Sequence, residues 1–258
     1  MIVRLEGHPN FRDMADPPVR GASGAAVRRG QLWRSGDLAT DDADLARLAA
    51  LGDLVAYDLR SHREASETPD RLPSGWTRVH LPIDEADGIR DVILARMASG
   101  DFTPPPGDLM VDAYQNIVGR WTDTLAEFMH RLADDQRPGV VHCTQGKDRT
   151  GVAAALVLSA IGVSWQDIEA DYLRSNEYRA DHNEATMAMV EGALAGEGAA
   201  RPDVSWLRAL LYVDARYLRA ARAAWERRSG STEQYLTEAL RLSPRDRAAL
   251  RVRFLEHV

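Results

Sequence analysis

The pattern of hydrophobic and polar positions predicts alternating strands and helices in the first part of the chain. Short apolar runs indicate strands, and these runs cover residues 31–35, 54–60, 77–83 and 139–141. Hydrophobic positions three or four residues apart indicate helices over residues 40–51, 89–97 and 108–134, with a helical turn within 64–73. Thr40 is the expected N-cap of the first helix, and Gly52 its expected end.

From residue 151 onward, the pattern contains only helical segments. They lie at 151–161, 164–173, 176–195 and 204–227, and two more follow the capping residues Ser231 and Ser243. Strands that alternate with helices favour a sheet covered by helices. We therefore predict an α/β fold with a central, mostly parallel sheet and a helix-rich C-terminal half. No linker divides the chain, so residues 1–258 are expected to form a single domain.

Composition narrows the possible partners and locations. A hydrophobic content of 45% is ample for a core, and a formal net charge of −7 argues against a nucleic-acid binder. The single cysteine excludes an intrachain disulfide. The N-terminus lacks the apolar core of a signal peptide, and the apolar stretch 152–163 is too short to cross a bilayer. We expect a soluble protein without integral membrane association, either cytoplasmic or secreted without a recognisable signal peptide.

The strand at 139–141 leads into a polar loop that has the properties of an oxyanion cradle. The loop begins at Cys143, ends at Arg149, and is followed by an apolar helix. Backbone N–H groups of Thr144, Gln145 and Gly146, together with the helix N-terminus, favour a bound anion. Arg149 can add a planar, two-pronged grip on phosphate oxygens.

Cys143 lies at the base of this cradle, behind the expected phosphate. A helix N-terminus and nearby cations favour the thiolate, which can attack phosphorus. Thr150 can donate a hydrogen bond to the thiolate, and His142 could fix the loop from behind by hydrogen bonds. The alternative for a lone cysteine is a small buried hydrophobic residue.

Three further charged residues are candidates for supporting roles. Lys147 is the only lysine among the 32 basic residues, which suggests a local task near a second phosphate or the transferred one. The alternative is chance variation in a surface loop. Asp58 and Arg60 lie at the polar end of the strand 54–60, where they could face the site or form a surface salt bridge.

The spacing of these residues resembles a known signature. Five residues separate Cys143 from Arg149, and Thr150 follows. This Cys-x5-Arg-Thr pattern is identified as that of the protein tyrosine phosphatase superfamily. Further segments resemble the bacterial atypical tyrosine phosphatases: Asn10-Phe11-Arg12-Asp13, Arg34-Ser35-Gly36-Asp37-Leu38, Asp58-Leu59-Arg60-Ser61 and Asp171-Tyr172-Leu173-Arg174-Ser175-Asn176.

The resemblance implies a phosphatase-type fold, no metal or other cofactor, and hydrolysis of phosphomonoesters through a phosphocysteine. It implies phosphotyrosine substrates, with phosphoserine, phosphothreonine and phosphoinositides as further possibilities. It also places a helical lid at about residues 176–212. Two alternatives remain open: a rhodanese-like sulfurtransferase, which also uses a cysteine below an anion cradle, and a phosphate-recognition module without turnover. Loss of Cys143 or Arg149 would mark the second, and both are present.

Two carboxylic acids compete for the role of general acid. Asp148 precedes Arg149 within the loop, as a similar aspartate does in phosphoinositide phosphatases of the myotubularin type. Asp84 follows the strand 77–83 and could move over the site, as the mobile acid loop of other tyrosine phosphatases does. We rank Asp148 first because its position needs no assumed motion. Asp58 is a third option, expected instead to orient Arg149 or the loop.

Overall fold

The computed structural model describes residues 3–16, 18–21, 24–84, 99, 105–194 and 204–256. The helix expected over 89–97 lies outside the described residues. The segment expected to act as a lid, 176–212, is described except for residues 195–203. Its role as a lid stays a prediction. Within the described residues, no helix is both long enough and apolar enough to cross a bilayer.

The described residues form one five-stranded sheet. Its strands are β1 (Arg12–Asp13), β2 (Leu32–Ser35), β3 (Val55–Asp58), β4 (Thr77–His80) and β5 (Gly139–His142). The order across the sheet is β1-β2-β5-β3-β4, and β1 runs antiparallel to β2 while the other pairs are parallel. The mostly parallel sheet expected from the sequence is therefore confirmed. The two-residue β1 was not predicted, since its sequence is polar.

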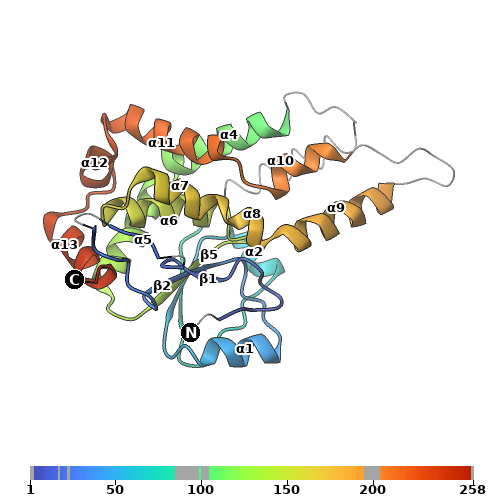
Figure 1. Cartoon of the computed structure of the whole chain (residues 1–258), viewed down its shortest axis with the longest axis horizontal. Coiled ribbons are helices and arrows are strands. Elements are labelled where there is room, and N and C mark those ends of the chain that lie inside the picture. The colour runs from blue at the N-terminus through green and yellow to red at the C-terminus, as the bar shows by residue number, and fades with distance from the viewer. Residues whose placement is uncertain are drawn as a thin grey trace.

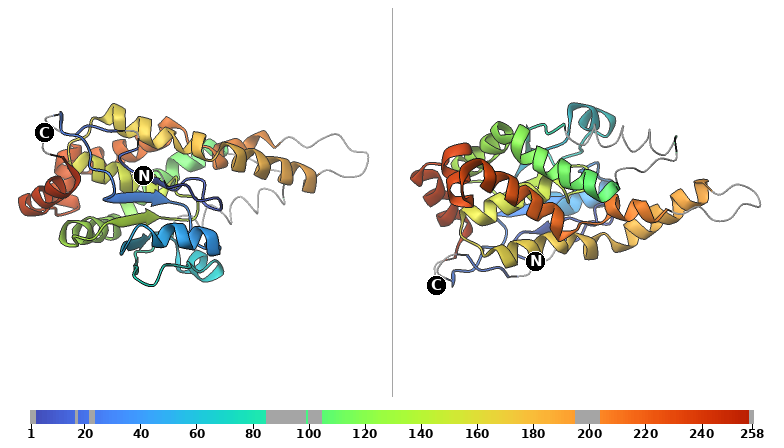
Figure 2. Two further views of the ribbon diagram at one scale, coloured as in Figure 1. Left: turned by 60° about the horizontal axis from the view of Figure 1, so that its bottom comes forward. Right: turned by 90° about the horizontal axis from the view of Figure 1, so that it is seen from above.

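Helices cover both faces of this sheet. They are α1 (Asp42–Ala49), α2 (His62–Glu67), α4 (Pro106–Arg120), α5 (Thr122–Asp134), α6 (Arg149–Ala160), α7 (Trp165–Leu173), α8 (Ser175–Tyr178), α9 (Ala180–Leu194), η2 (Ser205–Leu207), α10 (Arg208–Leu211), α11 (Ala215–Ser229), α12 (Thr232–Gln234), η3 (Tyr235–Ala239) and α13 (Pro244–Phe254). Helices α6, α7 and α11 lie on one side of the sheet and α1 on the other (Figure 1). Figure 2 shows the sheet and its covering helices from two further directions.

Alternation along the buried strands produces two hydrophobic layers. Tyr57 and Val141 belong to the larger core formed with the helices, whereas Ala56 and Val140 pack in the smaller one with Leu48 of α1. Successive side chains of a strand point to opposite faces, so strands buried on both faces are apolar throughout. The two layers hold the central strand β5 in place, and with it the loop that follows.

The parallel strands end at a common edge of the sheet. The register pairs His142 of β5 with Ser35 of β2 and with Asp58 of β3, and it pairs Asp58 with His80 of β4. Segments that follow these strands therefore leave the sheet side by side. Because β5 is central, its loop at residues 143–148 is flanked by the segments that follow β2 and β3.

The first correction to the predicted helices concerns residues 108–134, which form two helices instead of one. The interruption is at Trp121, where φ is −106° and ψ is 26°, outside the helical range. The hydroxyl of Thr122 donates to the carbonyl oxygen of Val118 at 2.8 Å across the interruption. Hydrophobic spacing continues through Trp121, so the sequence pattern did not reveal the break.

The segment 204–227 is interrupted as well. The chain leaves the helix at Tyr212, where φ is −99° and ψ is 153°, and α11 begins after the N-cap Asp214.

The N-cap of the first helix also differs from the prediction. Asp41 caps α1 by accepting a hydrogen bond from the backbone N–H of Asp44. The predicted N-cap, Thr40, instead donates its hydroxyl to the carbonyl of Arg71.

Candidate active site

The loop between β5 and α6 places Cys143 and Arg149 at its two ends. Cys143 is only 2% exposed and belongs to the main core cluster, while Arg149 is the first residue of α6. Between them, Gly146 has a φ of +68°, and a Cβ there would lie 2.3 Å from the carbonyl oxygen of Ser35. Glycine is therefore required both by the backbone conformation and by close contact with the segment after β2.

Side chains from outside the loop hold its carbonyl groups. Asn10 donates its Nδ2 to the carbonyl oxygens of Gln145 at 3.2 Å and of Gly146 at 2.8 Å. Arg34 adds a bond from Nη2 to the Gly146 oxygen at 3.0 Å, and Arg179 one from Nη1 to the Gln145 oxygen at 3.4 Å. These carbonyl oxygens are satisfied from behind and do not need to face a bound anion.

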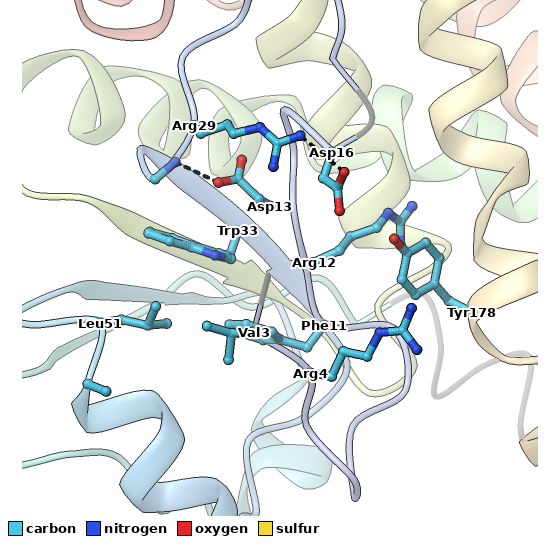
Figure 3. Close-up of a pocket in the computed structure, with 12 residues that line it drawn as sticks. Val3, Arg4, Phe11, Arg12, Asp13, Asp16, Arg29, Trp33, Leu51 and Tyr178 are labelled. Atoms are coloured by element: carbon cyan, nitrogen blue, oxygen red, sulfur yellow. Dashed lines mark hydrogen bonds and ion pairs between the residues drawn. The ribbon is translucent and has the colours of Figure 1, made fainter. Parts of the chain in front are cut away.

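A buried ion-pair network supports Asn10 and Arg34. Asp171 accepts from Arg34 at 2.8 Å and from Arg12 at 3.4 Å, and Arg12 also donates to the Oδ1 atom of Asn10. Burial and the neighbouring Arg34 lower the pKa of Arg12 to about 9. The guanidinium of Arg12 lies over the ring of Tyr178, 5.0 Å from its centre, at the edge of a cavity of about 410 Å³ (Figure 3). The segments that contain Arg12, Arg34 and Asp171 are far apart in the sequence, and they meet behind the loop.

Arg149 is held by Glu64 of α2, a residue that the sequence analysis did not single out. Its Nη1 lies 2.6 Å from Oε2 of Glu64, and its Nη2 lies 2.8 Å from Oε1. Burial alone would raise the pKa of Glu64, but the hydrogen bonds and charge of Arg149 outweigh it and lower the pKa to about 2. Glu64 itself is fixed by a capping box with Ser61. Glu64 instead of Asp58 therefore bonds Arg149, and the other part of that expectation, that Asp58 orients the loop, stays a prediction.

The hydroxyl groups of the loop differ in their partners. Thr144 donates its hydroxyl to Oε1 of Glu64 at 2.5 Å. The hydroxyl of Thr150 is buried without a hydrogen-bond partner, so the expected donation to Cys143 is not made in this structure. A buried hydroxyl without a partner is costly.

His142 does not make the hydrogen bonds expected of it. Its ring nitrogens lie 3.9 Å from Asp58 and 3.5 Å from Asp70, and neither forms a hydrogen bond. Burial lowers the pKa of His142 and favours the neutral ring. Its backbone carbonyl instead accepts from the N–H of Leu59, so the residue supports the loop through the sheet.

Lys147 and Asp148, two neighbouring residues of the loop, form an ion pair. The ammonium of Lys147 is 2% exposed and lies 2.8 Å from Oδ2 of Asp148. Oδ1 of Asp148 accepts from the hydroxyl of Tyr114 at 2.6 Å, and that hydroxyl is also 2.6 Å from the hydroxyl of Tyr172. Burial and the Asp148 charge raise the pKa of Tyr114 well above its usual value. The side chain of Asp148 is thus held in place within the loop, while one-quarter of it stays exposed.

The second candidate acid, Asp84, follows the strand β4. Its Oδ1 is buried and makes no hydrogen bond in this structure. The preceding residue, Ile83, accepts from Nη1 of Arg149 at 3.1 Å, so the chain that carries Asp84 is in contact with the loop. Residues 85–98 lie outside the described part of the chain.

Asp58, Asp70 and His142 bring ligand-type atoms within 4.8 Å of one another. Arg60 donates to both carboxylates, at 2.8 Å to Asp58 and at 2.5 Å to Asp70, and Arg78 donates to Asp58 at 2.6 Å. Burial alone would raise the pKa of Asp58, but the hydrogen bonds and charge of Arg60 lower it strongly. The carboxylates already bind guanidinium groups, so the cluster is explained as an ion-pair network instead of a cation site.

The chain belongs to the tyrosine phosphatase family, whose family model matches residues 3–256. It is 38% identical over 248 residues to a Cupriavidus necator protein assigned as a tyrosine-protein phosphatase, covering 95% of this chain and 85% of that protein. It is 35% identical over 266 residues to the triple specificity protein phosphatase PtpB of Mycobacterium tuberculosis, covering 93% of this chain and 94% of that protein. The resemblance expected from the motifs is confirmed, and the chain is an enzyme of the phosphatase class.

Proposed function

We propose that the enzyme hydrolyses phosphomonoesters through a phosphocysteine at Cys143. The observation that carries this proposal is the arrangement of one loop. Cys143 is buried in it, Asn10 holds the backbone carbonyl of Gly146, and Glu64 holds Arg149. The loop amides and Arg149 stabilise the charge that develops on the equatorial oxygens in the transition state. Thr144, Gln145, Gly146 and Thr150 belong to this phosphate cradle.

In the first step, the thiolate of Cys143 attacks phosphorus and the bond to the leaving oxygen breaks. Asp148 supplies a proton to that oxygen, and so becomes a carboxylate. Its place in the loop supports this role, because the residue precedes Arg149 and its carboxyl group is held there by Lys147 and by the hydroxyl of Tyr114. The products are the free alcohol or phenol and a phosphorylated Cys143.

In the second step, water attacks phosphorus and the sulfur–phosphorus bond breaks. The carboxylate of Asp148 takes one proton from the water, which restores the acid, and Cys143 leaves as a thiolate. Arg149 holds the same oxygens in both steps. Before phosphate binds, its Nη1 and Nη2 each donate to Glu64, which fixes the orientation of the guanidinium plane.

We propose phosphotyrosine as the primary substrate, with phosphoserine, phosphothreonine and phosphoinositides as further substrates. The family and the name of the mycobacterial relative, a triple specificity phosphatase, support this range. The test is to assay the purified protein against phosphotyrosine, phosphoserine and phosphothreonine peptides and phosphoinositide vesicles, with and without EDTA. Cys143→Ser protein is the blank. Turnover of phosphotyrosine that survives EDTA supports the proposal, and turnover that requires a divalent ion contradicts it.

A further inference from the structure

Among the described residues, Arg179 differs from the neighbouring buried cations because no carboxylate forms an ion pair with it. Its side chain is 4% exposed, its Nη1 makes one hydrogen bond of 3.4 Å to the Gln145 carbonyl, and its Nε makes none. Among the described residues, Arg149 and Lys147 each pair with a carboxylate, and Arg34 with Asp171. A buried charge without such a partner is unfavourable, and an anion would offset that cost.

The position of Arg179 is set by the junction of α8 and α9. Its N–H donates to the carbonyl of Ser175, and its own carbonyl accepts from the N–H of Asn183. The ring of Tyr178, the preceding residue, lies against Arg12 and Arg174, at 5.0 and 5.3 Å from the two guanidinium carbons. Figure 3 shows Tyr178 beside Arg12. The guanidinium of Arg179 is thus held by packed structure next to the catalytic loop.

Arg179 lines a cavity of about 200 Å³. His182 contributes a hydrogen-bonding group, and Thr144 and Gln145 form the wall that the cavity shares with the catalytic loop. Burial and the charge of Arg179 lower the pKa of His182, so its imidazole offers a neutral hydrogen-bonding group. Burial also lowers the pKa of Arg179 itself.

One carboxylate, that of Asp37, also lines the cavity and would repel an anion. Asp37 is placed there by its backbone N–H, which donates to the Thr144 carbonyl at 3.1 Å, while its Oδ1 accepts from the N–H of Ala39 at 3.4 Å. Arg179 lines the same cavity, and no carboxylate of the described part of the chain lies within ion-pair distance of its guanidinium. Since Asp37 opposes the charge of Arg179, we expect the cavity to bind an anion with modest affinity.

We propose that this cavity is a second anion site, which binds a phosphate group next to the one held by the catalytic loop. The phosphate is supplied as a second group on a small substrate or as free orthophosphate. Because the cavity and the loop share Thr144 and Gln145, two phosphates on adjacent atoms of a compact scaffold can occupy both. A phosphotyrosine peptide fits less well, since its flanking side chains lie at the far end of the aromatic ring.

The substrate form of this proposal rests on the proposed phosphatase activity, whereas the binding form does not. The test therefore measures binding to full-length Cys143→Ser protein by calorimetry. The probes are a myo-inositol bisphosphate with phosphates on neighbouring carbons, the matching monophosphate, orthophosphate, and a phosphotyrosine peptide with acidic neighbours. We expect the bisphosphate to bind about tenfold more tightly than the monophosphate, as one charge-assisted hydrogen bond provides.

Arg179→Ala in the same background should make the two inositol phosphates bind equally, and Arg179→Lys should restore part of the preference. Any loss of support to the Gln145 carbonyl affects both ligands and cancels in the ratio. The matched control is Arg208→Gln, which removes one positive charge from a side chain that is 56% exposed, and should leave the ratio unchanged. Asp37→Asn should strengthen bisphosphate binding several-fold by removing the opposing charge.

The binding measurements distinguish a second phosphate on the substrate from free orthophosphate. A preference for the bisphosphate that depends on Arg179 identifies a second phosphate of the substrate. A second equivalent of orthophosphate that is lost in Arg179→Ala, without a bisphosphate preference, identifies free phosphate. Absence of both, or a preference that persists in Arg179→Ala, overturns the proposal. So does a loss in Arg179→Ala that is confined to a phosphotyrosine peptide with acidic neighbours. Failure of the wild-type protein to hydrolyse any phosphomonoester would contradict the proposed function and leave these binding results standing.

Discussion

Arg149 and Glu64 form a two-point ion pair, with N–O distances of 2.6 and 2.8 Å. The pair joins the helix after the catalytic loop to α2, which follows the neighbouring strand β3. Glu64 also accepts from Thr144, so one carboxylate holds both ends of the loop. The orientation of the phosphate-binding guanidinium therefore depends on a residue outside the loop.

Glu64→Gln should lower kcat/KM for phenyl phosphate about ten- to one-hundredfold, because an amide cannot hold both guanidinium nitrogens as a carboxylate does. Steady-state kinetics measures the effect. The control is Glu67→Gln, which alters the same helix at an exposed ion pair with Arg63 and should have little effect. Equal kinetics of wild type and Glu64→Gln would show that Arg149 is oriented by other contacts.

The ion pair between Arg149 and Glu64 makes the free energy of unfolding depend on pH under acidic conditions. Since the pKa of Glu64 is about 2 in the folded protein and 4.5 in its usual state, its stabilising effect is complete above pH 4.5. It is lost as the pH falls from about 4.5 to about 2, and amounts to roughly 3 kcal/mol. Urea unfolding across this range should show a smaller pH dependence in Glu64→Gln than in wild type. Parallel curves for the two proteins would contradict this assignment.

Asp148→Asn should slow hydrolysis of phenyl phosphate by about 10² to 10⁴ and affect p-nitrophenyl phosphate much less. The reason is that p-nitrophenolate leaves readily without a proton. The basic limb of the pH profile should also flatten in this variant. Asp84→Asn is the comparison, and it should retain the wild-type pattern. If Asp84→Asn shows the selective loss and Asp148→Asn does not, Asp84 is the general acid.

Lys147→Ala should lower activity toward mono- and bisphosphorylated substrates by similar factors. Its ammonium is buried and paired with Asp148, which places it with the chemistry that all substrates share. Parallel assays of a phosphotyrosine peptide and a polyphosphorylated inositide measure the two losses. A loss confined to the inositide would instead assign Lys147 to a second phosphate, as one reading of the sequence suggested.

The catalytic loop could be predicted from the sequence because the residues that carry its chemistry are close together in the chain. Strand, loop and helix follow one another between residues 139 and 161, so the spacing of Cys143 and Arg149 already determines their relation. The mostly parallel sheet followed from the alternation of strands and helices. The helix breaks at Trp121 and Tyr212 could not be predicted, since hydrophobic spacing continues through both.

Supporting residues were harder to predict because tertiary packing brings them to the loop. Glu64 had a local signal, the capping-box spacing from Ser61, but nothing in that spacing indicates a contact with Arg149. Asp70, in the segment between α2 and β4, and Tyr114 of α4 come close to site residues only through tertiary packing. Arg179 has no local signal at all, as its burial depends on how α8 and α9 pack beside the loop.

The most direct test of the central claim is to identify the phosphorylated residue during turnover. Wild-type protein is mixed with p-nitrophenyl phosphate, quenched at steady state, and analysed by peptide mass spectrometry. The account predicts one phosphoryl group on the peptide that contains Cys143, attached through sulfur, and neither the adduct nor turnover in Cys143→Ser. Turnover by Cys143→Ser at the wild-type rate, or a phosphoryl group on another residue, would contradict the phosphocysteine mechanism.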